Sequence, residues 1–250
     1  MPVEEHLWTE QLTVRVYETD ANGTLAVRSL CDFLQEAAGN HARTYGVSVH
    51  QLLDKGLTWI LSRLRLRIQR LPVNGELLTV RTWPSGVERL FALRDFIISD
   101  ADGAEVAWAT SAWLILDTGS KRPVRVQSQF IPPAASRPRA LAASFEKLPP
   151  FEAPDLQQEI TVRWSDLDVN RHVNNSRYAE WAVEGAALSP GARGQLARLD
   201  IDFMAETQHP GSVIVQSRQT AGDPLRMSHA ILRAEDRAET ARVQTEWRSP

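Results

Sequence analysis

The sequence predicts an α+β protein made of two copies of one unit, each with a strand, a long helix and several antiparallel strands. Three observations support this prediction. The two halves of the chain align with each other, the order of strand-like and helix-like segments is the same in both, and a proline-rich segment lies between them. Self-similarity at a fixed offset is the sequence signature of an internal duplication.

The alignment of the halves starts at Val14 and Val162 and runs without a gap at an offset of 148 residues. It joins VRVYETDANGTLAVRSLCDFLQEAA to VRWSDLDVNRHVNNSRYAEWAVEGA. Identical residues in this register include Arg15 with Arg163, Asp20 with Asp168, Asn22 with Asn170 and Glu36 with Glu184. Their agreement in one register indicates duplication.

The first half begins with the strand-like run LTVRVY, a polar turn and a helix that we expect over residues 27–45. Apolar residues recur along this helix at intervals of three and four, as on one buried face. The face comprises Leu30, Phe33, Leu34, Ala37, Ala38 and His41.

Strand-like segments follow the helix. Residues 59–70 alternate in their middle, where Leu64, Leu66 and Ile68 point one way and Arg63, Arg65 and Arg67 the other, which is typical of a strand with one buried face. Three more strands are expected at LLTVRTW, LFALRDFIIS and EVAWATSAWLIL, with a hairpin turn at SDADG, residues 99–103.

The second half repeats the order with ITVRW, a polar turn and a helix over residues 174–188. Strands are then expected at RLDIDFM, SVIVQSRQ, SHAILRAED and TARVQTEW. We therefore expect an N-terminal unit over residues 1–130, a linker over 131–154 and a C-terminal unit over 155–250. Two such units can pair their antiparallel sheets side by side, which gives one continuous sheet with two long, wrapped helices.

Composition excludes several classes of function. Hydrophobic residues make up 43% and charged residues 24%, as in an ordinary globular protein, and no apolar run reaches the ~20 residues that span a bilayer. The acidic start lacks the pattern of a signal or transit peptide. The single cysteine, Cys31, favours a reducing, cytoplasmic setting, and the net charge of −3 gives no reason to expect nucleic-acid binding. Scattered histidines and the lack of a glycine-rich phosphate loop predict no metal and no cofactor.

One short segment, DLDVNRHVNN at residues 166–175, concentrates hydrogen-bonding side chains between a strand and a helix. Asp168, Asn170 and His172 stand at alternate positions, which face the same side of an extended segment. They could converge to activate water and stabilise an oxyanion. Alternatively, Asp168 or Asn170 satisfies free backbone N–H groups at the entry to the helix. The residues alone leave both interpretations open.

These segments together resemble the acyl-ACP thioesterases, which end fatty-acid synthesis by releasing the acyl chain. The resemblance rests on RWSDLDVNRHVNN, FLQEAAGNHARTYGVS, TWILSRLRLRI and RDFIISDADGAEVAWATSAWLILD, and it covers residues 10–130 and 158–248. It implies a tandem (double) hotdog and hydrolysis of long- or medium-chain acyl-ACP. Thr24 stands where His172 would be in the first half, so we expect one catalytic site, in the C-terminal half, and an acyl-binding N-terminal half.

The resemblance also places Glu206 on the family's catalytic glutamate. Thr207 follows it, where plant relatives carry a cysteine once proposed as nucleophile. Because the sole cysteine lies elsewhere, carboxylate-assisted attack by water is favoured, with Asp168 and His172 in the hydrogen-bond network of Glu206. Direct attack by Asp168 and a His172 base remain alternatives. Glu206 can also be interpreted as a solvated turn residue.

Several other residues have two interpretations. Asn174 and Asn175 are expected to cap the second helix, with substrate contact as an alternative. Trp59, like the other tryptophans of the first half, is a core residue that could also line the acyl tunnel. Glu184 is a further candidate carboxylate, but its repeat partner Glu36 favours a structural role. His41 is expected to be an interior histidine with satisfied hydrogen bonds.

The partner implied by the resemblance is acyl carrier protein, which is strongly acidic and should dock on a basic surface. One candidate is the row Arg63, Arg65 and Arg67, for which a solvated strand face is the default interpretation. A second candidate lies near the linker and comprises Lys121, Arg122, Arg125, Arg137 and Arg139. A membrane partner is not expected, and a homodimer is left open.

Two other functions compete with the acyl-ACP thioesterase. One is an acyl-CoA thioesterase of the same fold, and the other is a non-catalytic acyl-binding module. His172 and Glu206 argue against a pure binder. The sequence does not determine the acyl chain length, the preference between ACP and CoA, or which of Glu206, Asp168 and His172 is the base or nucleophile.

Overall fold

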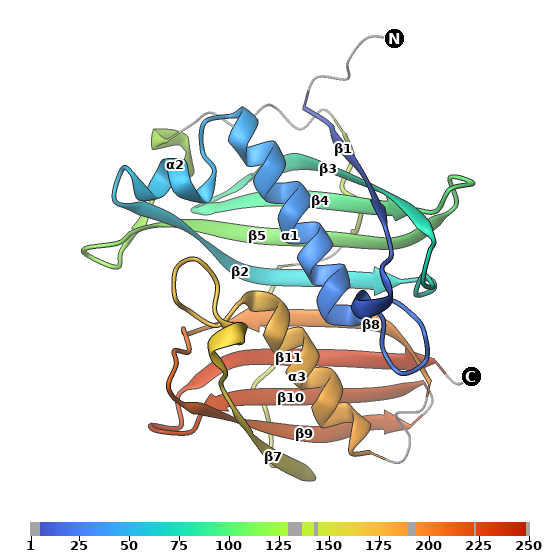
Figure 1. Ribbon diagram of the computed structural model, residues 1–250. Coiled ribbons are helices and arrows are strands. Elements are labelled where there is room, and N and C mark those ends of the chain that lie inside the picture. The colour runs from blue at the N-terminus through green and yellow to red at the C-terminus, as the bar shows by residue number, and fades with distance from the viewer. Residues whose placement is uncertain (1–5, 130–136, 143–144, 190–193, 223, 249–250) are drawn as a thin grey trace. The chain divides into compact units, whose positions relative to one another are not determined.

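Both halves of the chain form the predicted series of a strand, a helix and antiparallel strands (Figure 1). The computed structural model describes residues 6–129, 137–142, 145–189, 194–222 and 224–248. Its contacts divide the chain into a first unit, Met1–Leu64 with Leu71–Phe145, and a second unit, Arg65–Arg70 with Glu146–Pro250. The boundary at Phe145 lies inside the predicted linker, of which residues 131–136 and 143–144 are outside the described residues.

The first unit contains an antiparallel sheet with the strand order β1-β3-β4-β5-β2, of which β2 contributes its residues up to Leu64, and β6 pairs with β5. Its strands are β1 (Trp8–Thr13), β2 (Leu57–Ile68), β3 (Leu77–Glu88), β4 (Phe91–Ser99), β5 (Glu105–Asp117) and β6 (Pro123–Val124). Its helices are η1 (Val16–Glu18), α1 (Val27–Thr44), α2 (Val49–Leu53) and η2 (Val126–Ser128).

The second unit has an antiparallel sheet with the order β8-β11-β10-β9-β7. Its strands are β7 (Leu156–Thr161), β8 (Gln195–Phe203), β9 (Ser212–Gly222), β10 (Leu225–Arg233) and β11 (Glu239–Arg248). Its helices are η3 (Trp164–Asp166) and α3 (Asn175–Ala187). No helix in the described ranges is long and apolar enough to cross a membrane.

The two long helices each lie on one face of their own unit's sheet. In the first unit α1 contacts β1 and β3, and in the second α3 contacts β9, β10 and β11 (Figure 1). The predicted apolar face of α1 is confirmed, because every residue assigned to it is buried. The helix ends at Thr44, with Tyr45 as its C-cap, because Gly46 takes a positive φ of 71°, which glycine adopts at little cost.

The short helix α2 was not predicted. Its start carries a capping box, in which the Ser48 hydroxyl accepts from the Gln51 N–H and the Gln51 side chain accepts from the Ser48 N–H. Serine followed three residues later by glutamine is a recognised signal for a helix start. The signal was therefore present in the sequence.

Candidate active site

The turn before α3 is folded by its own hydrogen bonds. The Asp168 N–H donates to the His172 carbonyl at 2.8 Å, and Leu167 bridges Val173. The Asp168 Oδ1 accepts from the backbone N–H groups of Asn170 at 2.8 Å and His172 at 3.3 Å. These bonds are those of an Asx turn, so Asp168 has the structural role that was one of its two predicted interpretations.

The imidazole of His172 points from this turn to Glu206. His172 Nε2 lies 3.1 Å from Glu206 Oε2, and the two side chains are 21% and 38% exposed. An imidazole bonded to a carboxylate is held in one orientation and can exchange a proton with it or with water. The partial exposure of both side chains leaves the pair open to solvent.

Three contacts hold the loop that carries Glu206. The Val173 N–H donates to the Thr207 carbonyl at 2.9 Å, which fastens the loop to the turn. The Tyr178 hydroxyl donates to Thr207 Oγ1 at 2.9 Å, and Arg233 Nη1 donates to the Glu206 carbonyl at 3.1 Å. Burial raises the pKa of Tyr178 to about 12, so its hydroxyl keeps the proton that it donates.

Sequence reasoning missed Tyr178 and Arg233. Tyr178 lies one helical turn after the cap of α3, where an inward position could have been inferred from the helical period. Arg233 lies at the end of β10, and its contact with Glu206 depends on strand pairing. No local signal identifies such a contact.

The predicted capping role of Asn174 is confirmed. Its side-chain oxygen accepts from the Ser176 N–H at 2.9 Å and contacts the Ser176 hydroxyl at 3.0 Å. Asn175 is the first residue of α3, and Asn170 enters the turn through its backbone N–H. The helix N-terminus beside this turn carries partial positive charge, which suits an oxyanion. Substrate contact by the two helix asparagines stays a prediction.

A buried ion pair fixes η3 to α3. Arg177 Nη2 lies 3.1 Å from Asp166 Oδ1 and donates to the Ser165 carbonyl at 3.0 Å. Asp166 is buried and also accepts from the Arg163 N–H at 2.7 Å. Its carbonyl accepts from the Asn174 N–H at 2.8 Å. The segments on either side of the turn are therefore anchored independently of His172.

The first unit repeats the turn bond for bond. Asp20 Oδ1 accepts from the N–H groups of Asn22 at 2.9 Å and Thr24 at 3.2 Å, and the Asp20 N–H donates to the Thr24 carbonyl at 2.8 Å. Gly23 takes a φ of 75° where Arg171 takes 62°. The duplication predicted from the sequence therefore extends to individual hydrogen bonds.

Among the described residues of the first unit, the acid and the imidazole have no counterpart at the equivalent positions. There the Leu25 N–H donates to the Pro72 carbonyl at 2.7 Å, as Val173 does to Thr207. By this equivalence Leu71 takes the place of Glu206, and Thr24 takes that of His172. Both polar positions of the pair are thus replaced, of which the sequence comparison identified only one.

Glu184, the other predicted carboxylate, lies exposed on α3. Within the described part of the chain, the carboxylate recorded at ion-pair distance from His172 is that of Glu206. This contact favours Glu206 as the partner of the imidazole and a structural or solvated role for Glu184.

The prediction of an exposed arginine row is wrong. Arg65 is 2% exposed, and its Nη2 lies 2.8 Å from Asp202 Oδ1. Arg67 Nη1 lies 2.6 Å from Asp200 Oδ1, and Arg63 donates to the Phe145 carbonyl. A buried, paired guanidinium is not available to a docking partner, because removing it from its carboxylate would leave an unpaired buried charge.

The members of the second basic cluster, near the linker, differ in their exposure and contacts. Arg139 donates to Thr110 Oγ1 at 2.6 Å and lies 3.5 Å from the buried carboxylate of Asp95, so it serves the first unit's structure. Arg137 is half-buried. Lys121, Arg122 and Arg125 are exposed, so they remain candidates for a docking surface.

The remaining predicted residues lie in the first unit. His41 is buried, and Arg94 donates to its Nδ1 at 3.1 Å, which confirms an interior histidine. Burial and the Arg94 charge lower the pKa of His41 to about 4. Trp59 donates to the Val47 carbonyl at 2.7 Å and packs on an apolar cluster. Burial raises the pKa of Cys31 to about 12, so its thiol is a poor nucleophile.

No group of three or more histidine, cysteine, aspartate or glutamate side chains is placed to hold a metal ion among the described residues.

Comparison with known proteins gives a consistent result. One family model, the acyl-ACP thioesterase N-terminal domain, matches residues 5–133, and a second, the acyl-ACP thioesterase C-terminal domain, matches residues 152–249. The chloroplastic palmitoyl-acyl carrier protein thioesterase of Gossypium hirsutum is 29% identical over 97% of this chain and 64% of its own length. The chain thus spans less than two thirds of this plant relative.

Solved structures share the fold. A Lactobacillus plantarum protein provisionally described as an oleoyl thioesterase is 26% identical, covers 98% of both chains and gives a TM-score of 0.85. An acyl-ACP thioesterase from Bacteroides thetaiotaomicron is 24% identical, with coverage of 96% and 97% and a TM-score of 0.80.

Proposed function

Because the chain belongs to the acyl-ACP thioesterase family, we propose that it hydrolyses the thioester between acyl carrier protein and a long- or medium-chain acyl group. The products are a free fatty acid and the carrier protein. The observation that carries the proposal is the 3.1 Å contact between His172 Nε2 and Glu206 Oε2. This pair is an acid–base device that the otherwise matching turn of the first unit lacks.

In the proposed reaction Glu206 accepts a proton from a water molecule while His172 holds the carboxylate in place. The water oxygen bonds to the thioester carbonyl carbon, and the oxyanion is held by Asn170 or by an N–H at the start of α3. The carbon–sulfur bond then breaks, and the leaving thiolate takes up the proton. A positioned base contributes about 10²–10⁴ in rate, and one oxyanion donor about 10²–10³.

Two alternatives place the attack or the base elsewhere. Direct attack by Asp168 is disfavoured, because its Oδ1 already accepts two backbone N–H groups. The equivalent Asp20 makes the same two bonds in the unit that lacks the acid–imidazole pair. His172 as the base is compatible with the same contact, since the proton can rest on either member of the pair.

We place the acyl chain in the first unit. Trp59 is half-buried there against a cluster of apolar side chains: Val47, Leu52, Leu57, Ile115 and Val126. The indole is fixed by its bond to the Val47 carbonyl, so its ring can form a rigid wall. A double hotdog with continuous sheets and wrapped helices is part of this proposal, as are a cytoplasmic setting and a homodimer.

The proposal is tested by assaying the purified protein with one acyl group attached to ACP and to CoA. We expect a higher kcat/KM for acyl-ACP. Glu206→Gln should lose most of its kcat, whereas Glu184→Gln, a matched change on an exposed carboxylate of the same unit, should keep it. Undiminished hydrolysis by Glu206→Gln would overturn the mechanism. Binding of acyl-ACP without release of fatty acid would favour an acyl-binding module.

Chain length is measured separately. Expression in a bacterium, followed by identification of the free fatty acids that accumulate, would give the acyl preference. The printed names of relatives, palmitoyl and oleoyl, belong to those proteins.

A further inference from the structure

Large apolar side chains are exposed on the two segments that carry the catalytic pair. Trp164 in η3 is 72% exposed, and Val169 in the turn is 68% exposed. Met204, two residues before Glu206, is 47% exposed. Solvent-facing apolar groups that gather around a site are typical of a surface that another molecule covers.

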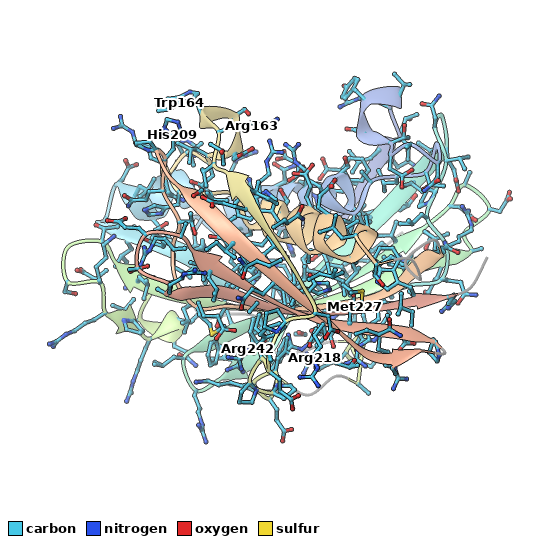
Figure 2. All side chains as sticks on the ribbon, turned by 90° about the horizontal axis from the view of Figure 1, so that it is seen from below. Arg163, Trp164, His209, Arg218, Met227 and Arg242 are labelled. Carbon is cyan, nitrogen blue, oxygen red and sulfur yellow. The ribbon has the colours of Figure 1, made fainter. Side chains whose placement is uncertain are left out.

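Trp164 of the first of these segments meets the loop that follows Glu206. The ring of Trp164 meets the ring of His209 edge-on, with centroids 6.0 Å apart. Figure 2 shows Trp164, His209 and Arg163 next to one another at the outer edge of the protein. The Val162 N–H donates to the Gly211 carbonyl at 2.9 Å, so the two segments are joined beside this group.

The exposed charges on the turn are positive. Arg163 and Arg171 are exposed, whereas Asp166 is buried against Arg177 and Asp168 faces the backbone of its own turn. A surface of this kind is complementary to an acidic partner with apolar side chains among its carboxylates.

The matching turn of the first unit has a net charge of −1, from Arg15, Glu18 and Asp20. Arg15 is paired there with Glu18 at 3.5 Å, and Asp20 is exposed. Gly23 stands at the position of Arg171. The first unit also exposes an aromatic residue, Tyr17, at 75%, so exposure of an aromatic ring is shared and the excess of positive charge is not.

Arg171 occupies a backbone conformation that costs energy. Its φ is 62°, a left-handed value at which the Cβ of an L-residue is crowded, and the equivalent Gly23 adopts 75° without that penalty. Arg89, Lys121 and Arg237 are also exposed with a positive φ, so this conformation by itself assigns no role. The exposed guanidinium of Arg171 is available for contact with a negatively charged molecule.

We propose that Arg163, Trp164, Val169, Arg171 and Met204 form the docking surface for the acidic acyl carrier protein. This inference rests on the proposed function and names the partner's contact site. Docking beside His172 and Glu206 places the carrier where its prosthetic arm can present the thioester to the pair. Arg65 in the arginine row of β2 cannot serve, because it is buried, and Arg63 and Arg67 are half-buried and already paired.

The test compares kcat/KM for an acyl group on ACP with kcat/KM for the same group on pantetheine, which lacks the carrier. Trp164→Ala, Arg163→Glu and Arg171→Gly should each lower the ratio of the two values by about tenfold or more. The arginine variants should lose less at high salt. Tyr17→Ala, which removes an exposed aromatic ring from the turn of the first unit, should leave the ratio unchanged.

Arg171→Gly carries a second readout. Because glycine relieves the left-handed strain, this variant should melt at a temperature equal to or above that of the wild type, although its kcat/KM for acyl-ACP falls. A variant that merely misfolded would melt lower. Equal losses on acyl-ACP and acyl-pantetheine would overturn the proposal, since the surface would then act on the shared part of the substrate.

Other occupants give different results, each of which contradicts the proposal. Charge reversal at Arg122 and Arg125 could lower the ratio of kcat/KM for acyl-ACP to that for acyl-pantetheine while Arg171→Gly leaves it unchanged. That result would assign docking to the first unit. A dimer that Trp164→Ala converts to a monomer would assign the surface to a second copy. A wild-type protein that cleaves acyl-pantetheine but not acyl-ACP would instead refute the proposed function, which is a distinct outcome.

Discussion

The turn of residues 14–26 and the turn of residues 162–174 have the same hydrogen bonds but differ at the positions where chemistry is expected. Asp20 and Asp168 each accept from two backbone N–H groups of their own turn. His172 with Glu206 is replaced by Thr24 with Leu71. Residues that both copies keep therefore serve the fold, and residues found in one copy are the candidates for catalysis.

The units also differ in how each buries a histidine. In the first, His41 of α1 accepts from Arg94. In the second, His229 of β10 lies 2.8 Å from Ser217 Oγ and 3.1 Å from Thr245 Oγ1. Burial lowers the pKa of His229 to about 3, so this imidazole is neutral in the folded protein near neutral pH. His41 and His229 are structural, whereas we propose a chemical role for His172, which is solvent-accessible beside the carboxylate of Glu206.

The largest expected effect comes from giving the second turn the residue of the first. His172→Thr should lower kcat for acyl-ACP by about 10²–10⁴ while the protein remains folded, because the turn is held by backbone atoms. Steady-state hydrolysis and a thermal melt check both parts. Thr24→Ser is the matched control and should keep wild-type kcat. A His172→Thr variant as fast as the wild type would remove the imidazole from the mechanism.

Acid should destabilise the second unit through His229. Below its ordinary pKa of 6.5 the imidazole binds a proton in the unfolded chain, but in the folded chain it does so only near pH 3. The neutral His229 therefore makes its full contribution to the free energy of unfolding above pH 6.5. This contribution falls by about 3 kcal/mol between pH 7 and pH 4.

Urea unfolding at several pH values measures this loss. His229→Gln should show a shallower decline than the wild type, with the residual slope due to groups such as His41. Parallel declines for the two proteins would show that His229 does not contribute to the acid sensitivity.

A glycine in each long helix shows how closely that helix packs against its surroundings. A Cβ added at Gly185 of α3 would lie 2.6 Å from Ser217 Oγ and 2.8 Å from Val215 Cγ1, whereas one at Gly39 of α1 meets nothing within 4 Å. Gly185→Ala should cost about 1–3 kcal/mol through overpacking, and Gly39→Ala should add up to about 1 kcal/mol. Urea midpoints that shift equally would contradict the close approach of α3 to its sheet.

The smallest effect is expected from the two shared aspartates. Asp20→Ala and Asp168→Ala should each lower the free energy of unfolding by about 1 kcal/mol. Each substitution removes the carboxylate that accepts from two backbone N–H groups, which must then bond to water. Asp168→Ala should reduce kcat much less than His172→Thr does. A loss as large as that of His172→Thr would restore Asp168 as a candidate nucleophile.

Local patterns predicted the elements and part of the site. The apolar spacing predicted the buried face of α1, and the spacing of DLDVNRHVNN predicted the turn and the Asn174 cap. The resemblance directed attention to Glu206, which the structure then brings to His172. These features depend on residues close in sequence or on a motif.

Features that depend on distant contacts were missed. The alternation in β2 predicted two faces, but it could not show that Asp202 and the Glu146 carbonyl cover Arg65. Arg233 meets Glu206 only after β10 takes its place in the sheet. Leu71 was not recognised as the counterpart of Glu206, because the ungapped alignment ends before it.

The most direct test of the account compares His172→Thr, Glu206→Leu and the double variant, each of which gives the second unit the residues of the first. If the two side chains act as one device, the double variant should be about as slow as the slower single variant, since either change disables the pair. Wild-type kcat in either single variant, or losses that multiply in the double variant, would contradict a single catalytic pair.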